Sequence, residues 1–186
     1  MTVRDAVRER AVDALTRLVR DIADFPEPGI VFKDITPLLA DPAGFGAVVE
    51  AMAAAGRDET GAVVVDKVVG MEARGFILAA PVALALGAGF VPVRKAGKLP
   101  HDTHQVDYAL EYGEAVLELH RDAVAAGERV LLVDDVLATG GTAAATHELV
   151  RRCGADVVGL AVLMELSFLP GRATIGDLPL HSLKTV

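Results

Sequence analysis

Apolar runs and helical patterns alternate along most of the chain. Short β-branched segments predict strands over residues 62–69, 90–93, 130–133 and 157–163. Residues 74–86 have the length and apolar character of a buried helix. This alternation predicts an α/β fold, in which a parallel β-sheet is flanked by helices and its strands are joined by right-handed crossovers. In such sheets, ligands bind at the carboxyl ends of the strands.

The N-terminal region and one central insertion depart from this alternation. The spacing predicts a helix to about residue 22, followed by the proline-rich loop DFPEPGIVFKDITPLL. Asp41 and Pro42 then fit the N-cap and first residue of a second helix. Residues 98–120 mix polar and apolar positions around Gly113, which predicts a β-hairpin or flap.

Length and composition predict one domain covering residues 1–186. Hydrophobic residues make up 52% of the chain, which suits a compact core. The net charge of -8 disfavours nucleic-acid binding, because neutralising phosphates requires an extended basic surface. Cys153 is the single cysteine, so an intramolecular disulfide is excluded and a reducing compartment is compatible. We therefore expect a cytoplasmic protein with no nucleic-acid partner.

One apolar stretch raises the question of a membrane span. Residues 75–93 carry no charge and are long enough to cross a bilayer. Pro81, Pro92 and the glycines around Ala88 divide this stretch into a buried helix and a short strand. The N-terminal residues alternate acids and bases and lack the apolar region of a secretory signal. We therefore expect a chain that does not associate with membranes.

The segment VLLVDDVLATGGT carries the strongest chemical signal. Its apolar run ends in two adjacent carboxylates, Asp134 and Asp135. Because strand side chains alternate faces, both acids can serve one ligand only if the backbone leaves the strand about there. Ionised carboxylates offer only acceptors, and a ribose 2′,3′-diol offers two donors. We interpret the pair as a ribose site, although the pair alone could equally be a magnesium site or a solvated strand end.

The Thr-Gly-Gly-Thr turn after these acids predicts a phosphate site. Gly140 and Gly141 permit positive φ and close backbone approach, and Thr142 is the expected N-cap of a helix running to about Cys153. Amide groups and the dipole at a helix start favour an anion. The chain has no G-x-x-x-x-G-K-[ST] loop and no G-x-G-x-x-G after a strand, which disfavours nucleoside triphosphates and dinucleotides. The pattern therefore favours a ribose 5-phosphate.

Two charged segments fall at the same predicted sheet edge. Within GMEARGF, Glu72 and Arg74 lie in a short loop that opens a helix, which is again an anion site. Within RKAGK, Arg94, Lys95 and Lys98 follow the next strand, and such a cluster suits a pyrophosphate. Taken separately, each segment is also compatible with ordinary solvated surface charge.

Six segments in this order resemble the type I phosphoribosyltransferase family, and within it the members that use adenine. They are FPEPGIVFKDITPLL, GMEARGF, RKAGKLP, YALEYG, VLLVDDVLATGGT and MELSFLPGR, and together they cover nearly the whole chain. The resemblance implies a purine salvage pentosyltransferase that converts adenine and 5-phosphoribosyl 1-pyrophosphate to AMP and pyrophosphate. It also implies an N-terminal hood, formed mainly by residues 1–40 and the C-terminal part, and a flexible flap at about residues 98–120.

The resemblance also implies roles for individual residues. Asp134 and Asp135 would hold the ribose hydroxyls, and the 5-phosphate would lie in a phosphate loop of Ala138, Thr139, Gly140, Gly141 and Thr142. The pyrophosphate would lie among Glu72, Arg74, Arg94, Lys95 and Lys98. Glu111 would be the acid/base residue in the flap, with Tyr112 as its neighbour. Adenine would contact Val31, Phe32, Lys33 and Leu166.

Two of these roles have simpler readings. An aromatic residue in an apolar run such as IVF is more often in a core, but the Pro-Gly before Phe32 and the Lys-Asp after it favour an exposed loop. Glu111, considered without the family, is better explained as a residue on a solvated strand face.

The resemblance further implies Mg2+ and a homodimer. The Mg2+ would arrive with the pyrophosphate of the substrate, since small hard cations bound to phosphates keep several waters and need few protein ligands. The histidines show no metal-ligand spacing. Two alternatives remain: a phosphoribosyltransferase for a 6-oxopurine or orotate, and a non-catalytic sensor of phosphoribosyl ligands. A sensor would need an output module, and no basic helix-turn-helix segment is evident.

Overall fold

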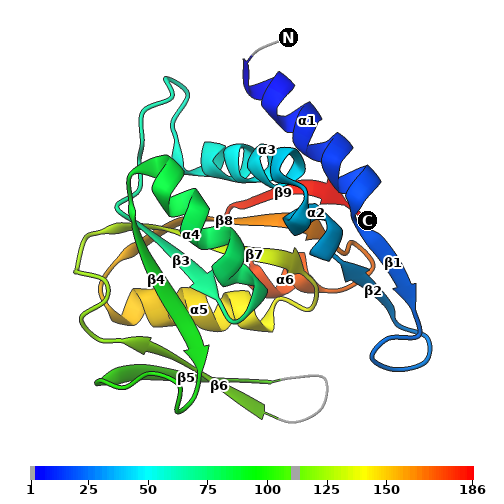
Figure 1. Ribbon diagram of the computed structural model, residues 1–186. Helices are drawn as coiled ribbons and strands as arrows, with labels where there is room; N and C mark the ends of the chain where they lie inside the picture. Colours follow the sequence, from blue (N-terminus) through cyan, green and yellow to red (C-terminus); the bar gives the residue numbers. More distant parts are fainter. Residues whose placement is uncertain (1–2, 110–113) are drawn as a thin grey trace. The chain divides into compact units, whose positions relative to one another are not determined.

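A seven-stranded, mostly parallel sheet organises the larger part of the chain (Figure 1). The computed structural model describes residues 3–109 and 114–186. Across these residues the strand order is β5-β6-β4-β3-β7-β8-β9. The strands are β3 (Lys67–Met71), β4 (Gly89–Lys95), β5 (Thr103–Ala109), β6 (Glu114–His120), β7 (Arg129–Leu137), β8 (Asp156–Glu165) and β9 (Leu180–Thr185). Strands β4, β3, β7, β8 and β9 run parallel, whereas β6 pairs antiparallel with both β4 and β5.

Helices cover both faces of this sheet, as the sequence predicts. Helix α4 (Arg74–Leu86) contacts β3, β4 and β7, and helix α5 (Gly141–Arg152) packs on the opposite face against strands from β5 to β8 (Figure 1). The predicted bounds of α4 are confirmed, and the helix ends at Gly87 with φ of 65°. Two shorter helices complete this part of the chain, the 3-10 helix η1 (Ala54–Gly56) and α6 (Gly171–Ile175). The predicted fold class is therefore confirmed.

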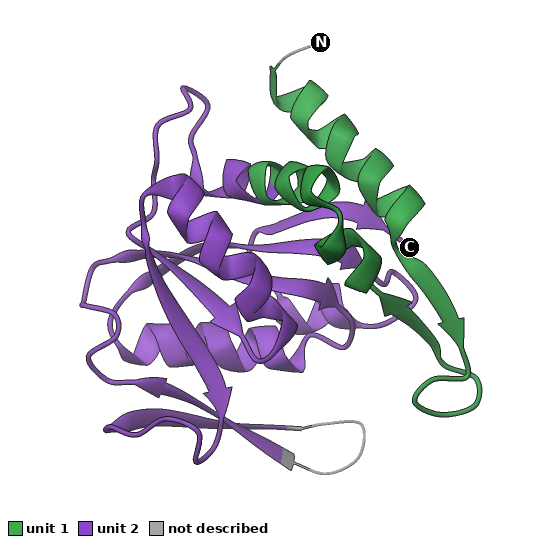
Figure 2. Ribbon diagram, in the orientation of Figure 1, with its two compact units in different colours: residues 1–51 green, residues 52–186 purple. Residues whose placement is uncertain are grey.

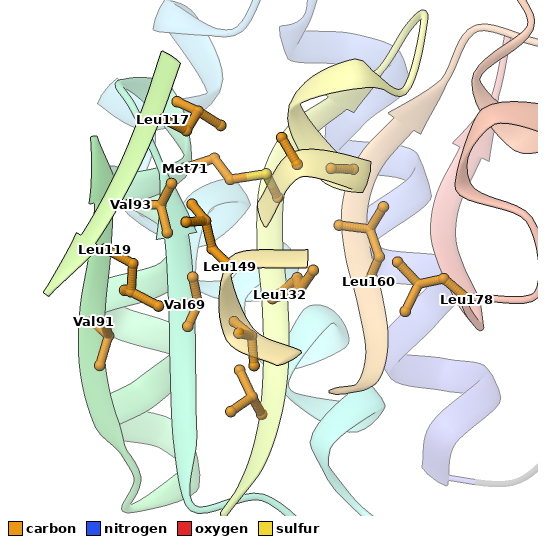
Figure 3. Packing of buried hydrophobic residues seen from close by; sticks show 14 of the residues in the cluster. Val69, Met71, Val91, Val93, Leu117, Leu119, Leu132, Leu149, Leu160 and Leu178 are labelled. Atoms are coloured by element: carbon orange, nitrogen blue, oxygen red, sulfur yellow. The ribbon is translucent and has the colours of Figure 1, made fainter. Parts of the chain in front are cut away.

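Side chains from the α5 face of the sheet form one continuous core. Val69 and Met71 of β3, Leu132 of β7 and Leu160 of β8 are all fully buried and surround Leu149 of α5 (Figure 3). Their alternation along the strands places the intervening residues on the other face, toward α4. Each strand buried on both faces therefore reads as a continuous apolar run.

The chain divides into two compact units, residues 1–51 and 52–186 (Figure 2). The first contains α1 (Val3–Leu18), β1 (Arg20–Ala23), β2 (Val31–Asp34) and α2 (Thr36–Ala40), and α3 (Pro42–Ala53) runs across the boundary. The hood predicted over residues 1–40 falls within this unit. Asp41 caps α3 as predicted, because its Oδ1 accepts the Gly44 amide at 2.6 Å.

Several predicted boundaries are wrong. The N-terminal helix ends at Leu18 instead of residue 22, because residues 20–23 pair with residues 31–34 in an antiparallel ladder. The strand predicted over residues 62–69 begins only at Lys67. The strand predicted to end at Val133 continues to Leu137, since β8 pairs with it as far as Leu137 and Glu165. Strand β9 was not predicted.

The residues 98–120 predicted as a flap contain the hairpin of β5 and β6, which pair from Thr103 and His120 to Ala109 and Glu114. Among the described residues, no helix is long and apolar enough to cross a membrane.

Close packing of α4 on β3 depends on Gly70, which yields a stability prediction. A Cβ at this position would lie 2.7 Å from the Ala79 Cβ and 2.9 Å from the Phe90 ring. We therefore expect Gly70→Ala to lower the free energy of unfolding by about 1–3 kcal/mol in urea titrations. The matched control is Gly46→Ala, at an exposed site inside α3 with no atom within 4 Å of the added Cβ. This control should raise stability by about 0.5–1 kcal/mol, and a Gly70→Ala variant as stable as wild type would contradict the packing argument.

Candidate functional site

A cavity of about 390 Å³ lies at the carboxyl ends of β3 and β7. Three segments line most of it: the loop between β3 and α4, the end of β7, and the start of α5. Leu160 and Val162 of β8 contribute apolar wall. All of these residues belong to the second unit. The cavity therefore lies where an α/β sheet is expected to bind its ligand.

The two adjacent carboxylates both line this cavity, but not for the reason that the sequence suggests. Asp134 and Asp135 lie inside β7, so the prediction that the backbone leaves the strand at these residues is wrong. Pairing between β3 and β7 stops at Gly70 and Val133, so the sheet is open on that side of the acids. At this opening the Asp134 side chain bonds to the neighbouring main chain: its Oδ1 accepts a hydrogen bond from the amide of Asp135 at 2.9 Å.

Burial governs the ionisation of this acidic pair. Burial raises the pKa of Asp134 well above its usual value, and the neighbouring Asp135 charge raises it further. Burial also raises the pKa of Asp135, which is 3% exposed, although the Arg74 guanidinium opposes this effect. The Arg74 Nε lies 2.7 Å from the Asp135 Oδ2. A ligand that brings hydroxyl donors would satisfy carboxylates that here have lost much of their solvent.

The phosphate loop follows directly and lines the same cavity through all five of its residues. Gly140 has φ of 85° and is the N-cap of α5, which begins at Gly141. The prediction of Thr142 as N-cap is therefore wrong: a left-handed glycine ends the loop two residues earlier, and Thr142 lies in the first helical turn. The first amide groups of a helix have no intrahelical acceptor, so this helix start can bind an anion.

The predicted pyrophosphate residues lie in two neighbouring segments that Glu72 joins. Arg74 is the first residue of α4. Arg94 and Lys95 are the last two residues of β4, so the prediction that they follow the strand is wrong, and Lys98 lies beyond its end. The Glu72 Oε2 accepts hydrogen bonds from the Arg94 Nε at 3.3 Å and the Lys95 amide at 3.0 Å. Burial raises the pKa of Glu72, but the Lys95 hydrogen bond and the Arg94 charge together bring it below its usual value. Glu72 is therefore an anionic brace that holds cations at the site. The exposed Lys98 contributes its carbonyl, which accepts from the Arg94 Nη1 at 3.2 Å.

The predicted adenine residues of the first unit lie in a strand. Val31, Phe32 and Lys33 belong to β2, so the prediction that Phe32 lies in a loop is wrong; its segment pairs with β1. Val31 is 51% exposed, and Phe32 packs edge-on against Phe25 with ring centroids 5.2 Å apart. Lys33 is mostly buried at its side chain and donates to the Asp21 Oδ1 at 2.7 Å.

The other predicted residues, Leu166, Glu111 and Tyr112, come later in the sequence than the first unit. Leu166 follows β8 in the second unit, where its amide donates to the Leu137 carbonyl at 3.0 Å. It is not among the residues that line the cavity. Glu111 and Tyr112 lie outside the described residues. Within the part of the chain that the structure describes, no group of three or more His, Cys, Asp or Glu residues is arranged to hold a metal ion.

Sequence reasoning missed several residues that shape the cavity. A Cβ at Gly75 would lie 2.9 Å from the Val133 carbonyl oxygen and 3.0 Å from the Asp134 Oδ1, so this glycine lets the start of α4 approach the acids. Gly171 packs equally closely behind the phosphate loop. The sequence could have indicated both residues, because each is a glycine beside charged residues of a motif, in GMEARGF and in LPGR. A glycine in such a place indicates a close approach of the backbone.

Comparisons with known proteins agree with this geometry. Residues 38–169 match the family described as phosphoribosyl transferase domain. Adenine phosphoribosyltransferase from a Nocardioides species is 70% identical over 169 residues, which are 91% of each chain.

Solved structures give the same result. The crystal structure of adenine phosphoribosyltransferase from Rhodothermus marinus has a TM-score of 0.87 and 47% identity, covering 96% of this chain and 99% of that one. The enzyme from Saccharomyces cerevisiae, complexed with an imino-altritol bisphosphate and adenine, has a TM-score of 0.89 and 39% identity, covering 94% and 98%. The cavity, the motifs and these relatives together show that the chain belongs to the adenine phosphoribosyltransferase family.

Proposed function

We propose that this protein transfers a 5-phosphoribosyl group from 5-phosphoribosyl 1-pyrophosphate to adenine, giving AMP and pyrophosphate. The observation that carries the proposal is the acidic pair of Asp134 and Asp135 and the adjoining phosphate loop, which line one cavity. The spacing suits one ribose 5-phosphate, with its hydroxyls on the carboxylates and its phosphate on the amides of the α5 start. The names of the relatives favour adenine as the base over a 6-oxopurine or orotate.

The reaction exchanges one bond at the anomeric carbon. A ring nitrogen of adenine forms a bond to this carbon as the bond to the pyrophosphate oxygen breaks, and the electron pair leaves with pyrophosphate. Positive charge develops on the ribose ring, and Asp134 and Asp135 supply nearby negative charge. The loss of solvent that raises their pKa also strengthens this electrostatic interaction.

The departing pyrophosphate needs positive charge around it. Arg74, Arg94, Lys95 and Lys98 are the residues proposed to supply it. Arg74 is held by Asp135, and Arg94 by Glu72, so two guanidinium groups are oriented before the substrate arrives. Glu72 does not contact the pyrophosphate itself in this proposal; it orients Arg94 and the Lys95 backbone, which do. We further propose that 5-phosphoribosyl 1-pyrophosphate enters as its Mg2+ complex, in which the cation neutralises pyrophosphate oxygens.

Base recognition and proton transfer are assigned to three other parts of the chain. Val31 would offer backbone hydrogen bonds to adenine, and Phe32 and Leu166 would supply its apolar contacts. Lys33, held by Asp21, would lie beside them. Glu111 would exchange a proton with the base, with Tyr112 as its neighbour, and the flap would exclude water from the activated sugar. We also propose a cytoplasmic homodimer, by analogy with the family.

The function is tested by AMP formation from adenine and 5-phosphoribosyl 1-pyrophosphate with Mg2+. Adenine presents a 6-amino donor beside an N1 acceptor, and hypoxanthine presents the reverse pattern. Backbone groups cannot exchange donor and acceptor roles, so we expect kcat/KM for adenine to exceed that for hypoxanthine by about 10⁴–10⁵. Comparable values would refute backbone recognition near Val31. Higher activity with a 6-oxopurine would overturn the adenine assignment.

Replacing Asp134 with Asn should stabilise the free protein and weaken sugar-phosphate binding. Because the folded-state pKa of Asp134 is raised, its stabilising contribution is present below the unfolded-state value of about 4 and is lost as pH rises through the folded-state pKa. Asn cannot ionise, yet it keeps an acceptor for the Asp135 amide. We expect Asp134→Asn to exceed wild type by about 1–3 kcal/mol in unfolding free energy at pH 8, with a smaller difference toward pH 4.

The same variant should bind ribose 5-phosphate roughly 10- to 100-fold more weakly in calorimetry, because it loses a charge-assisted acceptor. Asp177→Asn, at an exposed position, is the control and should change stability by less than about 0.5 kcal/mol. A stability gain that does not depend on pH would contradict the burial argument. An unchanged dissociation constant would remove Asp134 from the ribose site.

The proton-transfer role of Glu111 has its own test. Glu111→Gln keeps the shape of the side chain but cannot take a proton at neutral pH. We therefore expect kcat to fall by roughly 10²–10⁴ with little change in KM for either substrate. The measurement should use single-turnover conditions, so that chemistry and not product release is observed. Turnover near that of wild type under these conditions would show that Glu111 is not the acid/base residue.

A further inference from the structure

The segment after β8 packs behind the phosphate loop at backbone level. A Cβ at Gly140 would lie 2.7 Å from the Gly171 carbonyl oxygen and 2.8 Å from the Thr174 Cβ. Conversely, a Cβ at Gly171 would lie 2.9 Å from the Leu137 Cγ and would clash with the Ala138 carbonyl oxygen. Two glycines therefore meet here, and any displacement of Gly171 would move the loop that it supports.

The residue after Gly171 forms a two-point ion pair. The Arg172 Nε and Nη2 each donate to one oxygen of the Glu165 carboxylate, both at 2.7 Å. The Glu165 side chain is 9% exposed and that of Arg172 is 63% exposed. This fork geometry holds the guanidinium in a single orientation, which a lysine ammonium cannot reproduce.

The Glu165 end of this pair is itself immobilised. Glu165 is the last residue of β8 and lies opposite Leu137 in the β7 ladder. Its carbonyl accepts the Val186 amide at 2.9 Å, and the next amide, that of Leu166, donates to the Leu137 carbonyl at 3.0 Å. The ion pair therefore connects the rigid end of the sheet to the start of α6, across the segment that contains Leu166.

We propose that Arg172 is a positioning residue for the ribose 5-phosphate site, acting through Gly171 on the phosphate loop. The inference rests on the proposed function, because it assumes that this loop binds the 5-phosphate. Arg172 does not line the cavity. Its ion pair fixes Gly171, and Gly171 fixes the backbone of Ala138 and Gly140, so that the amide groups are preorganised for the anion.

The test compares Arg172→Gln and Arg172→Lys with Arg151→Gln as control. The Arg151 side chain is about as exposed as that of Arg172 and also forms an ion pair, with Glu148 on α5. Like Arg172, it does not line the cavity, but its ion pair lies near the end of α5, whereas the phosphate loop lies at the start of this helix. Calorimetry measures the dissociation constants of ribose 5-phosphate and, separately, of pyrophosphate with Mg2+. We expect Arg172→Gln to weaken ribose 5-phosphate binding roughly 10-fold while pyrophosphate binding stays within about 2-fold of wild type.

The lysine variant distinguishes fork geometry from charge. We expect Arg172→Lys to recover part of the lost affinity, and Arg151→Gln to match wild type for both ligands. Equal weakening of both ligands by Arg172→Gln would indicate general destabilisation and overturn the proposal, as would unchanged ribose 5-phosphate binding in a folded variant. If wild type itself binds no ribose 5-phosphate, the proposed function fails first.

Discussion

The burial of two adjacent carboxylates at the end of β7 is the constraint on which the site depends. Placing Asp134 beside Asp135 costs free energy, because both carboxylates lose water, and this burial raises the pKa of both groups. The charge of Asp135 raises the pKa of Asp134 further. Arg74 offsets part of this cost through its contact with Asp135. A ribose diol would offset more of it, so an arrangement unfavourable in the free protein favours the bound sugar.

Several elements of the second unit position Asp134 and Asp135 and shape the cavity around them. Because β3 ends early, the sheet opens beside Asp134, and Gly75 lets the start of α4 approach that opening. On the far side Gly140 turns the chain into α5, backed by Gly171. Two helix starts and one sheet edge therefore converge on the cavity, and each close approach relies on the absence of a side chain at a glycine.

Sequence patterns predicted what depends on local chemistry and missed what depends on neighbours. The bounds of α4 follow from its apolar run and Gly87, and the acidic pair and phosphate loop were found because their residue types are chemically distinctive. The extension of β7 to Leu137 could not be predicted, since β8 rather than the local sequence stabilises it. The ion pair between Arg172 and Glu165 could not be predicted either. It forms only because β8 ends at Glu165 and α6 begins at Gly171, and the sequence alone does not place these two ends next to each other.

The central claim is that the acidic pair and the phosphate loop together hold one ribose 5-phosphate. A crystal structure of the protein with AMP tests this claim most directly. The account predicts both ribose hydroxyls within hydrogen-bond distance of Asp134 and Asp135, and the phosphate on the amides of residues 138–142. A phosphate bound instead among Arg94, Lys95 and Lys98, or a ribose that makes no contact with the two carboxylates, would contradict it.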